Sequence, residues 1–265
     1  MNIIFREIRA HYKGLIGWSA GMLFLVIAGM AKFSAIASGG QQAIQLFKTF
    51  PKPVLVIAGI NGLDVGTAIG YFGVLYLYIL LLATIHAAMI GAEIISKEER
   101  DRTSEFLYPK PISRSKIVTE KLIAAIINII ILNLITTVSS ILAVSFYAKN
   151  FSNNNMILTL MIGLFIMQIL FFALGSVLAG VFKNPKLPTV VATAILLVTY
   201  IIWVIVDLNS KLDFLKYVTP FKYFDASVII NDGHLDPLYI ALSSVIIVIF
   251  ITTTYIFFNR RDLKV

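Results

Sequence analysis

Long apolar runs separated by short polar stretches dominate the chain. Six runs reach the length of about 20 residues that a helix needs to cross the hydrocarbon of a bilayer. They are Leu15–Ala37, Gly70–Ile95, Leu122–Ala148, Met156–Phe182, Leu187–Val206 and Leu238–Phe258. They lack period-two alternation, which argues against a transmembrane barrel, and helices satisfy their own backbone groups in lipid. The pattern predicts an all-α integral membrane protein with six transmembrane helices.

The composition agrees with a membrane location. Of 265 residues, 58% are hydrophobic and 14% are charged, whereas about a quarter of the residues of a soluble domain carry charge. The chain has no cysteine, which excludes disulfides, thiolate metal sites and a cysteine nucleophile. The whole chain, 1–265, is therefore expected to form one transmembrane domain.

Basic residues fall mainly on one side of this topology. Fifteen of the 22 lysine and arginine residues lie in the N-terminal segment, the connections between spans two and three and between spans four and five, and the C-terminal tail. The positive-inside rule therefore predicts that both termini are cytoplasmic. The net charge of +8 then indicates topology and contact with anionic lipid rather than nucleic-acid binding.

Residues 1–14 have an amphipathic pattern, with Ile4 and Ile8 on one helical arc and Arg6 and Arg9 on the opposite one. This pattern is typical of an interfacial helix, and an extension of the first span is the alternative. Because the sequence 35–37 reads Ala-Ile-Ala, a cleaved signal peptide is another alternative. The apolar run is longer than that of usual signal peptides, which favours a retained helix.

Two connections on the opposite side have their own character. Residues 39–69 predict an external helix that leads into span two, and Asp64 is the expected cap of span two. Five glycines, from Gly59 to Gly73, are expected to form a packing seam. The alternative is a loop that uses glycine for turns. Residues 207–237 combine acids with aromatic residues around Pro220, which indicates a short segment at the membrane surface.

Polar residues inside the spans are candidates for a substrate path, since they are costly in lipid. These candidates are His86, Glu93, Asn128, Asn133 and Gln168. Polar side chains also join helices to one another, and this interpretation is favoured for most of the polar residues in the spans. For Glu93, near the cytoplasmic end, we expect an ion pair with a loop arginine.

The segment 97–116 is the most highly charged connection. It mixes acids and bases with Phe106 and Leu107, and Pro109 and Pro111 interrupt any helix there. Charges of both signs with apolar anchors are typical of a docking surface. A solvated run of charges is the alternative.

The segment and the start of the third span contain Thr103, Glu105, Leu107, Pro111, Ser113, Arg114 and Lys121. With these residues the chain resembles the permease subunits of ABC-2 type transporters, which often carry Gly-Thr-x-Glu-x-Leu and then Pro-x-Ser-Arg before the third span. Arg102 replaces the common glycine. Leu63-Asp64 with Gly70-Tyr71, and the sequence 219–225, also resemble bacterial members, so the resemblance covers essentially the whole chain.

The resemblance implies a short coupling helix that docks into a separate ATPase subunit. The implied coupling residues are Glu98, Glu99, Arg102, Thr103, Glu105, Phe106, Leu107, Pro111, Ser113 and Arg114. The chain has no P-loop, so ATP and Mg are expected on the partner, with no cofactor on this chain. The resemblance also implies an exporter in a bacterial plasma membrane. This exporter would contain a second copy of the chain or a related permease.

Two other classes compete with this interpretation. Glu98-Glu99 is similar to the Glu-Glu-x-x-x-Arg of CAAX-type membrane proteases, but Thr103 stands where the arginine is required. A non-transporting immunity or sensor protein built on the same bundle is the other alternative.

Overall fold

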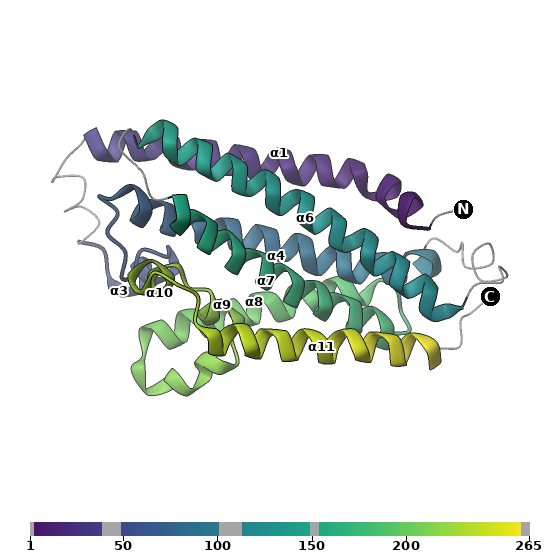
Figure 1. The fold of residues 1–265 in the computed structure, drawn as a ribbon. Coiled ribbons are helices and arrows are strands. Elements are labelled where there is room, and N and C mark those ends of the chain that lie inside the picture. The colour runs from purple at the N-terminus through teal and green to yellow at the C-terminus, as the bar shows by residue number, and fades with distance from the viewer. Residues whose placement is uncertain (1–2, 39–48, 101–112, 149–153, 261–265) are drawn as a thin grey trace.

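The described part of the chain is almost entirely helical. A computed structural model describes residues 3–38, 49–100, 113–148 and 154–260 (Figure 1). These ranges contain no strand and six helices that are long and apolar enough to cross a membrane. The six are α1 (Ile3–Ser38), α4 (Ala68–Arg100), α6 (Arg114–Tyr147), α7 (Asn154–Val181), α8 (Leu187–Leu208) and α11 (Pro237–Arg260). The prediction of an all-α protein with six spans is confirmed.

Several helices extend beyond the predicted spans. α1, α4 and α6 contain 36, 33 and 34 residues, which corresponds to about 50 Å at 1.5 Å per residue, against about 30 Å of hydrocarbon. Lys97–Arg100, assigned to the loop 97–116, continue α4, and the same loop's last residues, from Arg114, begin α6. The reason is that lysine, glutamate and arginine are good helix formers, so the helix outlasts the apolar run.

The predicted N-terminal helix is not separate from the first span. No break occurs between residues 3–14 and residue 15, and both belong to α1. Residues 3–14 therefore extend the first span, which was the alternative to a separate helix. Their location in the headgroup layer stays a prediction.

The long helices pack in three layers, with α1 beside α6, α4 beside α7, and α8 and α11 on the far side (Figure 1). The central pair approaches most closely at two glycines. A Cβ atom on Gly91 would lie 2.2 Å from the Phe172 carbonyl oxygen, and one on Gly175 would lie 2.3 Å from the Ala88 carbonyl oxygen. Only glycine permits this backbone contact, and small residues are typical of such crossings in membranes.

The connection before α4 uses glycine in two ways. A short helix, α3 (Lys52–Ile57), is followed by turns in which Gly59 and Gly62 have φ angles of +72° and +78°, so the turn alternative holds for these two. Gly73 instead packs against Leu63 and Ile230. The predicted cap Asp64 lies about one turn before the start of α4, where it accepts a hydrogen bond from Gly66 N at 3.0 Å. Thr67 accepts one from Gly70 N at 3.1 Å and so caps α4 itself.

The connection before α11 forms short helices, while its predicted location at the membrane surface stays a prediction. It consists of η1 (Ser210–Tyr217), α9 (Pro220–Tyr223) and α10 (Ala226–Asp232), and Gly233, with φ of +79°, ends α10. These elements lie at the end of the bundle where α3 lies (Figure 1). The first residues of α1 and the last of α11 both lie at the opposite end (Figure 1).

Candidate functional site

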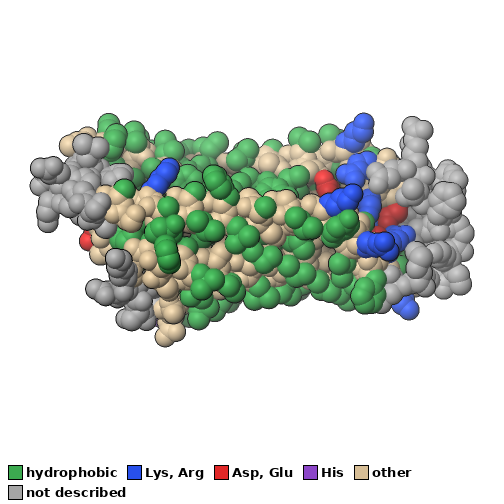
Figure 2. All heavy atoms as spheres, turned by 90° about the horizontal axis from the view of Figure 1, so that it is seen from above, with side chains coloured by type: hydrophobic (Ala, Val, Ile, Leu, Met, Phe, Trp, Pro, Cys, Tyr) green, Lys and Arg blue, Asp and Glu red, His purple; other side chains and the backbone are tan. Residues whose placement is uncertain are grey.

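Charge is concentrated at the end of the bundle that holds the first residues of α1. Lysine and arginine side chains gather there, whereas the body of the visible face is mainly apolar (Figure 2). The helix ends that border residues 101–112 lie at this end too (Figure 1). A site that links that segment to the membrane-spanning helices is therefore expected here.

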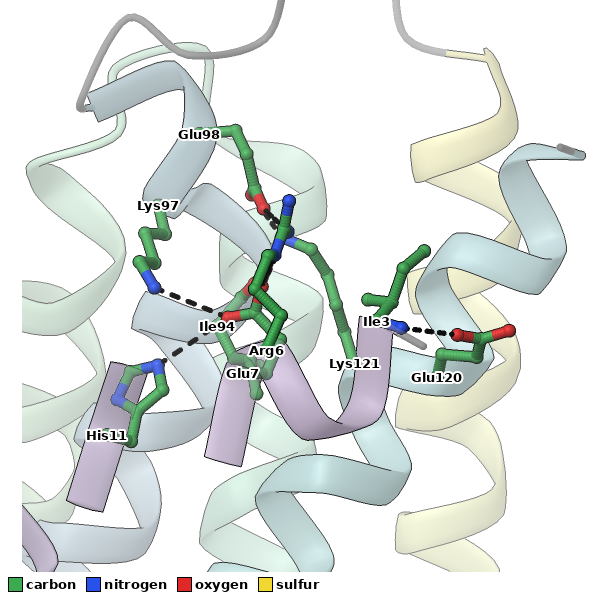
Figure 3. A network of polar contacts seen from close by, with 9 residues as sticks. All are labelled: Ile3, Arg6, Glu7, His11, Ile94, Lys97, Glu98, Glu120 and Lys121. Carbon is green, nitrogen blue, oxygen red and sulfur yellow. Dashed lines mark hydrogen bonds and ion pairs between the residues drawn. The ribbon is translucent and has the colours of Figure 1, made fainter. Parts of the chain in front are cut away.

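Lys121 is the centre of a buried ionic network at this end (Figure 3). This α6 side chain is fully buried. Its Nζ donates to the Ile94 carbonyl oxygen of α4 at 2.6 Å and pairs with the Glu98 carboxylate of α4. A buried ammonium group is tolerated only when it is paired and hydrogen-bonded, and both conditions are met.

α1 joins the network through Arg6 and Glu7. Arg6 Nη2 lies 2.9 Å from Glu98 Oε1 and 2.6 Å from Glu7 Oε1. The Glu7 side chain is buried, and its other oxygen lies 3.4 Å from Lys97 Nζ of α4. The five charged side chains, Arg6, Glu7, Lys97, Glu98 and Lys121, therefore tie α1, α4 and α6 together.

A contact at each edge extends this arrangement. The Ile3 backbone N–H of α1 donates to Glu120 Oε2 of α6 at 3.2 Å. His11 Nε2 lies 3.9 Å from Glu7 Oε2. The first turns of α1 are thus attached to both α4 and α6.

The start of α6 is also attached to α11. Ser113 is the N-cap of α6 and accepts a hydrogen bond from Lys116 N at 3.3 Å. Arg114 Nη1 donates to the Asn259 carbonyl oxygen at 3.2 Å, and the Thr119 and Tyr255 hydroxyls lie 2.8 Å apart. Ser113 and Arg114 therefore have a local structural role, which is to start α6 and to fix its first turn to α11.

The predicted coupling residues divide into three groups. Arg102, Thr103, Glu105, Phe106, Leu107 and Pro111 lie outside the described residues. Glu99 and Arg114 are at least partly exposed, and Ser113 is exposed. Glu98, expected on an exposed docking surface, is only 4% exposed and belongs to the buried network. In this structure Glu98 therefore links helices and does not present a free surface.

The predicted path residues lie within the bundle. His86 of α4 is buried against Trp18, with ring centroids 5.3 Å apart, and Asn128 is its neighbour. Asn133 Nδ2 donates to Gln168 Oε1 at 3.0 Å, which joins α6 to α7. These contacts match the interpretation that such groups join helices.

Glu93 differs from the other four because it forms an ion pair near the helix end. Its Oε1 lies 3.7 Å from Arg100 Nη1. The expected pairing of Glu93 with an arginine near the loop is therefore present.

A second polar cluster lies at the other end of the bundle. Lys222 pairs with Asp207 at 2.5 Å and with Asp225 at 3.2 Å, and Trp203 Nε1 donates to Asp225 Oδ2 at 3.0 Å. Burial disfavours the charge on Lys222, but Asp225 and Asp207 outweigh burial and raise its pKa above the ordinary value. Asp225 also caps α10 through Ser227 N, so this cluster fastens α9 and α10 to α8.

Sequence reasoning missed Glu7 and the role of Lys121. Glu7 is the only acid before Asp64 and stands among Arg6, Arg9 and Lys13, a signal for a specific ion pair. Lys121 directly precedes the third predicted span, where the sequence indicates only a match to the family pattern and one more basic residue on the predicted cytoplasmic side.

Together, six helices that are long and apolar enough to cross a membrane indicate a multi-pass membrane protein. A comparison with curated proteins finds no significant match. The family model described as ABC-2 family transporter protein matches residues 1–263. The chain belongs to this family of membrane transporter components.

Proposed function

We propose that the chain is the permease subunit of an ATP-driven exporter, with the segment 101–112 as the docking site of a separate ATPase. Membrane proteins of the ABC-2 family generally work with ABC ATPase partners. The sequence has no P-loop of its own. ATP and Mg then bind to the partner, and this chain supplies the path across the membrane.

The observation that carries the proposal is the buried network around Lys121. Residues 100 and 113 border the proposed docking segment. The end of α4 connects to α1 through Glu98 and Arg6, the start of α6 connects to α1 through Glu120 and Ile3, and Lys121 joins α6 to α4. A displacement of the docking segment would therefore be transmitted to α1, α4 and α6 together. A second copy of the chain, or a related permease, would complete the path in a bacterial plasma membrane.

The test is to purify the chain together with a candidate P-loop ATPase and to compare variants. We expect Glu105→Ala with Phe106→Ala to abolish copurification or stimulation of ATP hydrolysis, because these residues are the proposed acidic and apolar anchors. Insertion in the membrane should be unchanged. Lys186→Ala, in the exposed turn between α7 and α8, is the matched control and should behave as wild type.

The outcomes also separate the competing classes. Recruitment of an ATPase with vanadate-sensitive movement of a substrate supports transport. Recruitment without any movement indicates an immunity or sensor subunit, and wild-type activity of the Glu105/Phe106 variant would overturn the docking assignment.

A further inference from the structure

The short helix η1 lies where two of the candidate spans end. It begins two residues after the last residue of α8, and the ring centroids of Tyr217 and Tyr239, in the first turn of α11, are 6.5 Å apart. α8 and α11 contain 22 and 24 residues, close to the length of about 20 residues that crosses the hydrocarbon. η1 is therefore expected at the level of the membrane boundary, and it lies to the side of the long helices, in the light green loop before α9 (Figure 1).

The surface of η1 has an aromatic row and a charged row. Residues three apart in a 3₁₀ helix lie above one another, so Phe214 and Tyr217 form one row and Asp213 and Lys216 form another. Phe214 is 66% exposed and Tyr217 is 48% exposed. Asp213 and Lys216 pair with each other at 2.7 Å, so the charged row carries no net charge. η1 is thus amphipathic, with its large apolar side chains turned away from the protein.

The aromatic residues that follow η1 are buried instead. Phe221, Tyr223 and Phe224 are 1%, 3% and 0% exposed, and the ring centroids of Phe221 and Phe171 of α7 are 6.0 Å apart. These three residues contact the protein and not the bilayer. In this connection, the exposed aromatic side chains of the described residues belong to η1.

We propose that Phe214 and Tyr217 insert into the membrane interface beside α8 and α11. Their partner is the phospholipid of the leaflet at that end, with the rings against the upper acyl chains and the Tyr217 hydroxyl at the headgroups. Aromatic side chains concentrate at this boundary, and tyrosine has an apolar body with a polar tip. Ile205 in the last turn of α8 and Leu238 in the first turn of α11 are 40% and 52% exposed, so the apolar surface of both spans extends to the level of η1.

Spin labels on single cysteines test this insertion, because the chain has no cysteine of its own. Phe214→Cys and Tyr217→Cys are labelled with a nitroxide in the full chain and reconstituted in vesicles of phosphatidylcholine and phosphatidylglycerol. Power-saturation spectra then measure collisions with oxygen, which concentrates in hydrocarbon, and with a water-soluble nickel chelate. Asp232→Cys, exposed on α10, is the control for water, and Val248→Cys, 64% exposed in the middle of α11, is the control for lipid.

We expect the labels at positions 214 and 217 to collide more often with oxygen than with the nickel chelate, as the label at position 248 does. The label at position 232 should show the reverse. Two results would overturn the proposal. Frequent collisions with the nickel chelate at positions 214 and 217 would place η1 in water, and few collisions with either reagent would show that protein, such as a second copy of the chain, covers the row.

A fluorescence measurement tests the same contact without a spin label. The sequence contains only Trp18 and Trp203, and their signal, taken from the wild-type chain, is subtracted from that of Phe214→Trp. We expect lipid brominated near the headgroup to quench the added tryptophan and aqueous iodide to leave it largely unquenched. Asp232→Trp is the matched control and should show the opposite preference. Quenching of Phe214→Trp by iodide, without quenching by the brominated lipid, would refute the insertion.

Discussion

At the scale of single residues, the buried pair of Lys121 and Glu98 shows why the charged end cannot be a simple solvated surface. Each group has lost its water, and each depends on the other and on the Ile94 carbonyl or Arg6. Removal of one partner from such a pair leaves an uncompensated buried charge.

We therefore expect Lys121→Met to lower the free energy of unfolding by about 3–5 kcal/mol, the usual cost of breaking a buried ion pair. Unfolding by denaturant in mixed micelles would measure it. Lys116→Met, on an exposed position of the same helix, should change stability by no more than about 0.5 kcal/mol.

A double variant separates the pair from general damage to the site. Glu98→Gln added to Lys121→Met removes the orphaned carboxylate, so part of the lost stability should return. A double variant as unstable as the sum of the two single variants would contradict a direct pairing.

The sequence revealed which residue types were unusual but not which of them meet. Glu7 and Lys121 are separated by more than a hundred residues, and their association depends on the rotation of α1, α4 and α6 about their axes. Hydropathy does not specify that rotation, because the helices are apolar on most sides.

At the scale of the elements, the contact between α4 and α7 depends on Gly91 and Gly175. The nearest atoms to an added Cβ are backbone atoms of the other helix, which cannot rotate away as a side chain can. Overpacking of this kind usually costs about 1–3 kcal/mol and sometimes more.

Gly175→Ala should accordingly lower the melting temperature in detergent and reduce the yield of folded protein. Gly17→Ala is the matched change, since a Cβ there meets nothing and alanine favours helix by about 1 kcal/mol. Should Gly175→Ala melt at or above the wild-type temperature, the backbone contact would be refuted.

The number and order of the six long helices followed from hydropathy, but their ends did not. α4 continues through the charged residues 97–100 because these residue types favour helix. α1 includes the amphipathic segment because no proline or glycine pair interrupts the helix before Gly14. The turns at Gly59 and Gly62 require positive φ, which spacing alone does not distinguish from a packing seam.

At the scale of the whole molecule, the two ends of the bundle differ in chemistry. The end that includes Lys116 is the proposed cytoplasmic end, and the end that includes α10 is the proposed external end. This orientation follows from the distribution of the basic residues.

The chain has no cysteine, so single cysteines report the orientation directly. We expect a membrane-impermeant maleimide to label Asp232→Cys in intact cells and Lys116→Cys only after permeabilisation, since both positions are exposed. The reverse pattern would invert the topology and remove the docking segment from the compartment of an ATPase.

The touching backbones of α4 and α7 have a consequence for any cargo. Where Gly91 meets Phe172 and Gly175 meets Ala88, not even a methyl group fits between the two helices. A molecule that crosses the membrane therefore has no passage between α4 and α7 at this level. On the proposed function, its route would run along another face of this pair.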